Sequence, residues 1–173
     1  MTVLSPDGIP LFSLEYVQHI ADWMGWMLPV YAYMLAFLYT WLHEAGHALA
    51  AVSLGTRVTH FQVGAPVWFR CRPRRVILKF GLLKPTGGVT YRYADDAPRW
   101  KVMLTALAGP LFPVFLTVPV FHLVGIQPMT VAAGFMVTVQ TLANLNPFMR
   151  GTDGRKVFLH LHALSQGRRT LDT

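Results

Sequence analysis

Three long hydrophobic runs, separated by polar segments, dominate the chain. A helix needs about 20 predominantly apolar residues to cross a bilayer, and each run is at least that long. The runs cover residues 29–54, 100–126 and 129–149. Prolines interrupt the second run, and membrane helices tolerate proline where neighbouring groups satisfy the freed backbone. The pattern therefore predicts three transmembrane helices.

The first 28 residues predict a helix that lies at the membrane interface. From residue 11 onward, apolar side chains recur at helical spacing, while Glu15 and Asp22 fall mostly on another face. Trp23 and Trp26 follow, and tryptophan rings prefer the level of the lipid headgroups.

Residues 55–99, between the first and second runs, predict a small β-sheet or a pair of hairpins. The segment is polar and basic, and glycine and proline separate its short β-branched and aromatic stretches. Those stretches are VTHFQVG, VWFRCR, RVILKFG and GGVTYRY. A turn, a short helix to about Gln166 and a basic tail are expected over residues 150–173.

The predicted fold class is therefore membrane α-helical. It has three transmembrane helices, an N-terminal interfacial helix and a small β-sheet inserted between the first and second spans. Residues 1–173 are expected to form a single membrane-embedded domain.

The charges of the chain indicate its orientation in the membrane. The composition is 53% hydrophobic and 13% charged, with a net charge of +7. All fifteen Lys and Arg residues lie at or after Arg57, so the first 56 residues carry only acidic fixed charges. By the positive-inside rule, residues 55–99 and the C-terminal part lie in the cytoplasm. We expect a multi-pass protein of the cell membrane and no nucleic-acid partner, because no recognised binding module accompanies the basic residues.

The only ionisable side chains of the first run, apart from tyrosines, are His43, Glu44 and His47. They form an HExxH sequence, in which two histidines four residues apart on a helix offer two imidazole nitrogens to one Zn²⁺. The glutamate between them is placed to act on a water molecule at the metal. Ionisable groups inside a membrane span cost several kcal/mol each and usually mark function, which favours a metal site over a set of satisfied polar residues.

A catalytic zinc needs a third protein ligand and one open position. Asp153 is the best candidate; its alternative role is to cap the last short helix, and the two roles are compatible. The other candidates are His60, His122, His160 and His162. Cys71 is the only cysteine, which excludes a site built from several cysteines.

Three signatures occur in an order that resembles the site-2 protease family of intramembrane zinc metalloproteases. They are His43-Glu44-Ala45-Gly46-His47, Ala108-Gly109-Pro110, and Asn144-Leu145-Asn146-Pro147 followed by Asp153-Gly154. The resemblance covers roughly residues 30 to 160 and implies a minimal catalytic core without the PDZ or CBS modules of many relatives.

The resemblance implies a role for each residue of these signatures. His43, His47 and Asp153 would bind zinc, Glu44 would be the catalytic acid and base, and Asn144 would help to position the substrate carbonyl. The chain departs from the family in two places. Five residues separate Pro147 from Asp153 where the family usually has four, and Phe112-Pro113 replaces the asparagine that often follows the AGP signature.

The expected function is hydrolysis of peptide bonds within membrane-spanning proteins, for example an anti-sigma factor or another membrane-bound regulator. The partners are then this substrate and the lipid bilayer. The alternative is a non-proteolytic scaffold or chaperone of the same fold, or a lipid-surface binding protein. The lipid-binding alternative rests on a basic cluster beside Trp68 and Phe69, formed by Arg70, Arg72, Arg74 and Arg75.

The segment from Pro85 to Tyr91 resembles the edge strand with which the family holds its substrate. Its Gly87-Gly88 pair would let another backbone approach closely. A hairpin turn at the same pair is the alternative.

Overall fold

The structure is a computed structural model that describes residues 8, 10, 13–73, 75–94 and 97–167. Leu11, Arg74 and the basic tail after residue 167, which enter the sequence predictions, lie outside these residues. The described elements are α1 (Leu14–Met24), α2 (Met27–Ser53), β1 (Arg57–Ala65), β2 (Phe69–Cys71), β3 (Ile77–Phe80), β4 (Lys84–Arg92), α3 (Arg99–Val124), α4 (Pro128–Leu145) and α5 (Asp153–Ser165).

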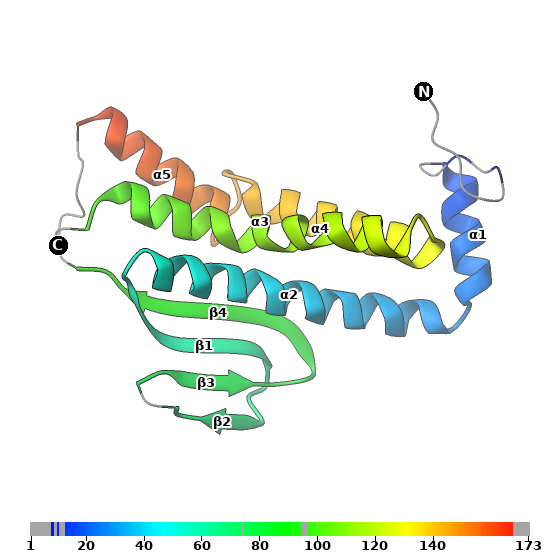
Figure 1. Ribbon diagram of the computed structural model, residues 1–173, viewed down its shortest axis with the longest axis horizontal. Coiled ribbons are helices and arrows are strands. Elements are labelled where there is room, and N and C mark those ends of the chain that lie inside the picture. The colour runs from blue at the N-terminus through cyan, green and yellow to red at the C-terminus, as the bar shows by residue number, and fades with distance from the viewer. Residues whose placement is uncertain (1–7, 9, 11–12, 74, 95–96, 168–173) are drawn as a thin grey trace.

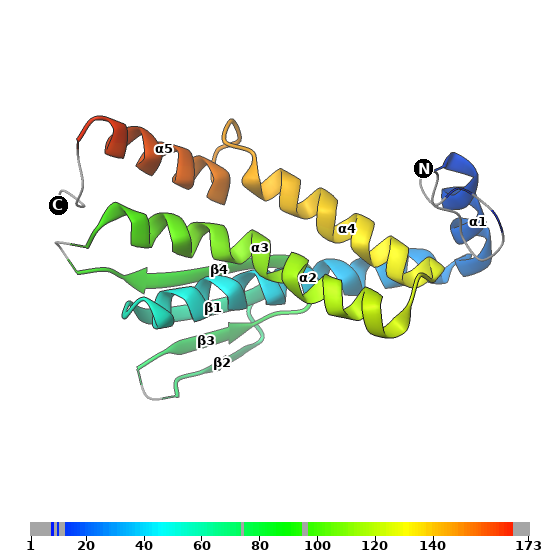
Figure 2. The ribbon, with the colours of Figure 1, turned by 45° about the horizontal axis from the view of Figure 1, so that its top comes forward.

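Helix α2 lies at the centre of the molecule, between a helical layer and a sheet. Helices α3, α4 and α5 lie on one side of it and the four-stranded sheet on the other (Figures 1 and 2). Helix α2 therefore contacts both layers, and side chains on its different faces can meet groups from each.

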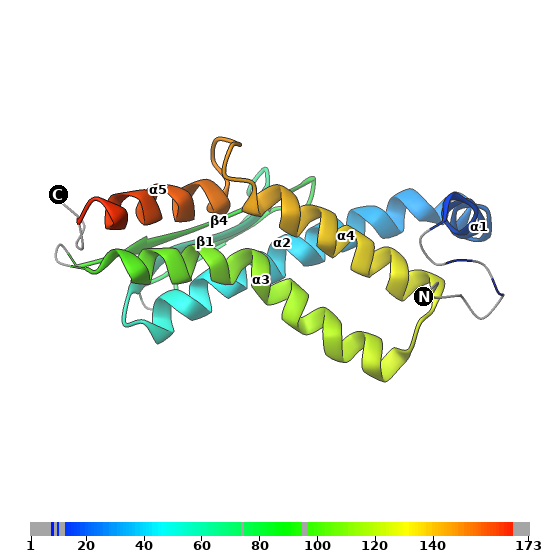
Figure 3. The same ribbon diagram turned by 90° about the horizontal axis from the view of Figure 1, so that it is seen from above.

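Helices α2 and α3 approach each other closely at Gly46. A Cβ atom at Gly46 would come within 2.5 Å of the Ala108 carbonyl oxygen and 2.6 Å of the Phe112 Cβ atom. Neither neighbour is the flexible end of a long side chain, so a larger residue would push the helices apart. The second half of α3, which contains Pro113 and Pro119, diverges from α2 (Figure 3).

The sheet is mixed and lies alongside α2. Its strand order is β2-β3-β1-β4, with β1 and β3 parallel and the pairs β1–β4 and β2–β3 antiparallel. Strands β4 and β1 pack against α2, and the Tyr33 hydroxyl of α2 donates a hydrogen bond to the Leu82 carbonyl oxygen. The sheet is thus one structure rather than two separate hairpins, and Gly87-Gly88 lies inside β4 rather than in a turn.

Helix α1 packs on the helical layer through one face. Its buried residues Tyr16, Ile20 and Met24 recur at helical spacing and contact Leu28, Tyr31 and Val131. The Ser13 side chain caps its first turn by accepting a hydrogen bond from the Tyr16 amide. The opposite face leaves Val17 and Trp23 exposed.

The helices begin and end close to the residues that the hydrophobic pattern predicted. Within the described residues, α3 is the one helix that is long and apolar enough by composition to cross a membrane. Helix α2 carries Thr40, His43, Glu44 and His47 within its apolar sequence, and α4 has only 18 residues. Membrane crossing by α2 and α4 therefore stays a prediction.

Candidate metal centre

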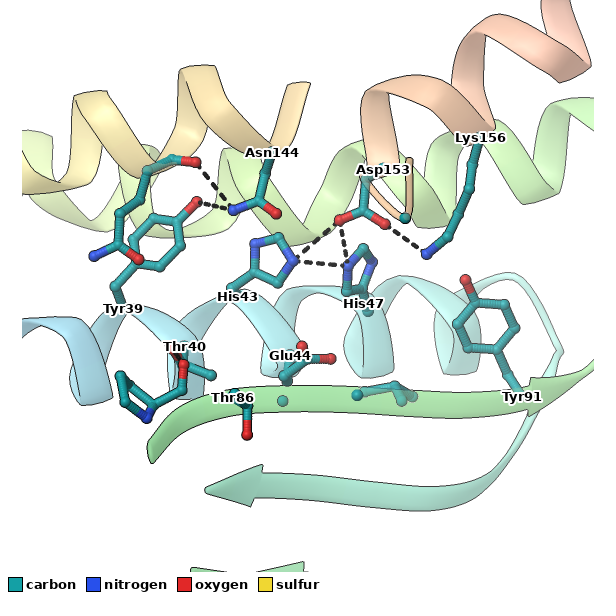
Figure 4. Close-up of a pocket in the computed structure, with 16 residues that line it drawn as sticks. Tyr39, Thr40, His43, Glu44, His47, Thr86, Tyr91, Asn144, Asp153 and Lys156 are labelled. Carbon is teal, nitrogen blue, oxygen red and sulfur yellow. Dashed lines mark hydrogen bonds and ion pairs between the residues drawn. The ribbon is translucent and has the colours of Figure 1, made fainter. Parts of the chain in front are cut away.

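The two histidines of the HExxH sequence lie on one buried face of α2. Because His43 and His47 are four residues apart, their rings stand one above the other, with centroids 4.7 Å apart. Both side chains are buried, and so is Glu44 between them. The α2 helix presents the histidines to the helical layer and Glu44 to the sheet (Figure 4).

Asp153 reaches the histidines from the first turn of α5. The residue that caps this helix is Thr152, whose hydroxyl accepts a hydrogen bond from the Arg155 amide. The alternative role of Asp153 as the helix cap is therefore excluded, because Thr152 fills that position and leaves the Asp153 carboxylate free to point at α2. A side chain at Gly154 would collide with the Leu145 backbone, so this glycine allows α5 to start against the end of α4.

The additional residue before Asp153 lies in the turn between α4 and α5. Gly151 adopts φ +83 there, a left-handed conformation that glycine takes without strain. The turn closes with hydrogen bonds from the Thr152 hydroxyl to the carbonyl oxygens of Asn146 and Met149. The five-residue spacing is thus accommodated in the turn, as the presence of Gly151 suggests.

Three donor atoms converge on one point. The Nε2 atoms of His43 and His47 are 3.1 Å apart, and each is 3.1 Å from Oδ2 of Asp153. A tetrahedral zinc site with bonds of about 2.0–2.1 Å separates its donor atoms by roughly 3.3 Å. The spacing of the three atoms therefore fits a small divalent metal ion.

The hydrogen bond at the far side of the His47 ring supports the same conclusion. Its Nδ1 atom lies 2.7 Å from the Thr105 carbonyl oxygen, which can only accept, so Nδ1 carries the proton. In the neutral ring, Nε2 then presents a lone pair to the Asp153 oxygen. Two electron-rich atoms at that distance repel each other unless a cation lies between them, and such an outer hydrogen bond is typical of metal-binding histidines.

A glycine on each side of α2 leaves room for these side chains. At Gly109 of α3, a Cβ atom would overlap the His47 ring, which gives a physical reason for the glycine of the AGP signature. At Gly87 of β4, a Cβ atom would lie 2.5 Å from the Glu44 Cγ atom. The Glu44 Oε2 atom is buried and makes no hydrogen bond with the described residues.

Lys156 is a member of the site that the sequence reasoning missed. Its Nζ atom lies 2.7 Å from Oδ1 of Asp153, the carboxylate oxygen that does not face the histidines. Burial alone would raise the pKa of Asp153, but the neighbouring imidazole rings of His43 and His47 and the Lys156 ammonium group hold that pKa well below its ordinary value. The signal in the sequence was the spacing of three residues on a helix, which places the two side chains together.

The other candidate ligands lie elsewhere. His60 is in β1 beside the Thr59 hydroxyl, His160 contacts Arg99, and His162 contacts Gln166. His122 lies in the last turn of α3. Among the described residues, His43, His47 and Asp153 are the group whose ligand atoms come close enough to share a metal ion.

The candidate metal-binding group faces a cavity of about 390 Å³ between the helical layer and the sheet. Figure 4 shows Asn144 at this cavity, on the side of His43 that faces away from Lys156. The lining residues are Tyr39, Thr40, His43, Glu44, His47, Pro85, Thr86, Gly87, Gly88, Val89, Tyr91, Gln140, Asn144, Gly151, Asp153 and Lys156. Six of them belong to β4, so the strand forms one wall of the cavity.

A buried pair of histidines and a carboxylate, with a further carboxylate beside them, is the side-chain set of a metallopeptidase. Residues 31–167 match the family described as Peptidase family M50, the site-2 protease family. The chain belongs to this family of membrane-associated, metal-dependent peptidases.

Replacement of Asp153 by alanine tests the third ligand. We expect Asp153→Ala to weaken metal affinity by at least about 100-fold. Loss of a residue that only hydrogen-bonds to a ligand already lowers metal affinity by about 10-fold to 100-fold. Chelator competition on the purified protein measures this affinity. His60→Ala is the control and should bind metal like the parent, and normal binding by Asp153→Ala would exclude Asp153 as a ligand.

Proposed function

We propose that this protein is an intramembrane zinc metalloprotease that hydrolyses peptide bonds of membrane-spanning substrate proteins. The observation that carries the proposal is the convergence of three candidate ligand atoms at 3.1 Å from one another. Glu44 follows His43 on the same helix, and its Oε2 atom has no hydrogen-bond partner among the described residues. Two imidazoles and one carboxylate with an open position form a donor set that suits catalytic Zn²⁺.

His43, His47 and Asp153 would hold the zinc ion. When bound, zinc lowers the pKa of water toward about 7 and polarises a carbonyl group. Thr105 keeps the His47 ring in the tautomer that offers Nε2, and Lys156 holds the far oxygen of Asp153, so Oδ2 alone points to the histidines.

Glu44 is the general base and acid of this proposal. Its side chain projects from α2 toward β4, into the wall of the cavity that an extended peptide would occupy (Figure 4). Its Oε2 atom is free to take a proton from water and to pass that proton to the amine that leaves. Gly87 opposite leaves this carboxylate its space.

The membrane arrangement that we propose has three spans, α2, α3 and α4, with the active site toward the cytoplasm. His47 lies six residues and His43 ten residues before Ser53, the end of α2. At 1.5 Å per residue, these residues would lie roughly 9 and 15 Å below the cytoplasmic end of the helix. Water would reach them through the cavity between α2, β4 and the turn at Gly151.

The proposed substrate is a transmembrane protein, for example an anti-sigma factor or another membrane-bound regulator. A helical peptide bond is already hydrogen-bonded, so the substrate helix must unwind before cleavage. Strand β4 supports capture of the unwound segment, because β4 pairs with β1 along one side and belongs to the cavity wall on the other. Strand addition to a free edge uses main-chain hydrogen bonds and reads few side chains.

Substitution of Glu44 by glutamine separates metal binding from catalysis. We expect Glu44→Gln to retain stoichiometric zinc while cleavage of a membrane-spanning substrate falls at least about 100-fold, because an amide cannot shuttle the proton. Metal analysis and a cleavage assay on the same preparation measure both quantities. Cleavage at the parental rate would contradict the mechanism.

The single cysteine provides a test of orientation. Cys71 in β2 should stay unlabelled when intact cells meet a membrane-impermeant maleimide, and should react after lysis. As a matched control, Glu15→Cys in a Cys71→Ser background places a thiol on the exposed face of α1 and should label without lysis. Labelling of Cys71 in intact cells would reverse the topology.

Proline substitution tests the role of the β4 edge, because proline removes a backbone donor. We expect at least one of Val89→Pro and Thr90→Pro to reduce cleavage strongly, to a similar extent for substrates of different sequence, while zinc content stays normal. Phe69→Pro and Arg70→Pro in β2, the opposite edge of the sheet, are the controls and should cleave normally. The edge is not used if both β4 variants cleave at the parental rate.

A further inference from the structure

A short series of hydrogen bonds connects three helices beside the metal ligands. The Thr141 hydroxyl of α4 lies 3.1 Å from the Pro110 carbonyl oxygen of α3 and 3.4 Å from the Tyr39 hydroxyl of α2. The Asn144 Nδ2 atom lies 3.4 Å from the same Tyr39 hydroxyl. Tyr39 and Thr141 are 3% and 7% exposed, so water does not replace these partners.

The direction of each hydrogen bond follows from the groups at the two ends. A carbonyl oxygen only accepts, so Thr141 donates its one proton to Pro110. Thr141 must then accept the proton of the Tyr39 hydroxyl. Because that proton is used, the Tyr39 oxygen can only accept from the Asn144 amide.

A second contact fixes which way the Asn144 side chain faces. Its Nδ2 atom lies 3.0 Å from the Gln140 carbonyl oxygen, and a carbonyl oxygen there requires a donor. Both amide hydrogens of Asn144 are thereby engaged, one by Gln140 and one by Tyr39. Figure 4 shows the remaining atom, the Oδ1 oxygen, directed away from both partners toward His43.

We infer that Tyr39 and Thr141 are positioning residues that hold Asn144 as an acceptor for a main-chain N–H group of the substrate. The inference rests on the proposed peptidase function. It differs from the role that the family resemblance implies, since a substrate carbonyl needs a donor and Asn144 has none left. An extended peptide beside β4 presents N–H groups as well as carbonyl groups, and one of them would meet Oδ1 next to the metal ligands.

We call the hydrogen bonds from Asn144 through Tyr39 and Thr141 to the Pro110 carbonyl the relay. The relay can be tested without an activity assay. Its two hydrogen bonds should make both side-chain amide protons of ¹⁵N-labelled Asn144 shifted and slow to exchange in an NMR spectrum. Tyr39→Phe or Thr141→Val should release one of these protons, whereas Thr138→Val should not. Thr138 is a matched control, because within the described part of the chain its hydroxyl bonds to the Gly134 carbonyl oxygen of its own helix and not to a relay residue.

The acceptor role is tested with a membrane-spanning peptide that the parent protein cleaves. Ester bonds replace its amide bonds one at a time near the cleavage site, and each ester lacks the N–H donor. One ester position should weaken binding to the zinc-loaded Glu44→Gln protein about threefold to tenfold, and should have no further effect once Asn144→Ala is added. Tyr39→Phe and Thr141→Val should raise KM by a similar factor while kcat stays near the parental value.

Three outcomes would overturn the inference. The first is an ester scan in which no ester position changes its effect when Asn144→Ala is added. The second is that the Asn144 amide protons are unchanged in both Tyr39→Phe and Thr141→Val. The third is that both of these variants have the same KM as Thr138→Val. Failure of the proposed function is a separate result, because a protein that cleaves no peptide can still show the relay in its NMR spectrum. If Tyr39→Phe does not fold, Thr141→Val interrupts the same relay from α4.

Discussion

The close approach of α2 and α3 is the contact on which the rest of the site depends. It exists because Gly46 has no side chain against Ala108 and because Gly109 has none against the His47 ring. At this distance the Thr105 carbonyl reaches Nδ1 of His47. Five residues further along α3, the Pro110 carbonyl accepts a hydrogen bond from Thr141 of α4. A methyl group at either glycine would separate the helices and would disturb both hydrogen bonds.

The balance of charge at the site imposes a second constraint. Two lone pairs and a carboxylate oxygen converge within a buried region, and such an arrangement is costly unless positive charge neutralises it. Lys156 supplies one positive charge at the far oxygen of Asp153, and a metal ion between the three donors would supply the remainder. Because Lys156 and Asp153 lie one turn apart on α5, the helix carries a ligand and its counter-charge together, and the Thr152 cap holds the first turn in place.

The sequence predicted those features that depend on local spacing. Hydrophobic runs defined α2, α3 and α4 within a few residues, and the HExxH spacing placed His43 and His47 on one face. Features that depend on contacts between distant segments were not predictable in the same way. The parallel pairing of β1 with β3, the position of the sheet along α2 and the assignment of the helix cap to Thr152 are such features. Tyr39 resembles an ordinary helix residue until the fold brings it to Asn144, whereas the spacing of Lys156 from Asp153 was a local signal.

The two glycines of β4 have different surroundings in the fold. The sequence suggested that Gly87 and Gly88 let a second backbone approach, yet a Cβ atom at Gly87 would strike Glu44, while one at Gly88 would meet nothing within 4 Å. Alternate residues of a strand face opposite sides, so Gly87, Val89 and Tyr91 share a face, and that face includes the contact with Glu44. Bulk at Gly87 would therefore displace the Glu44 carboxylate itself. The close contact at Gly87 thus fixes the distance between β4 and the Glu44 carboxylate in the wall of the cavity.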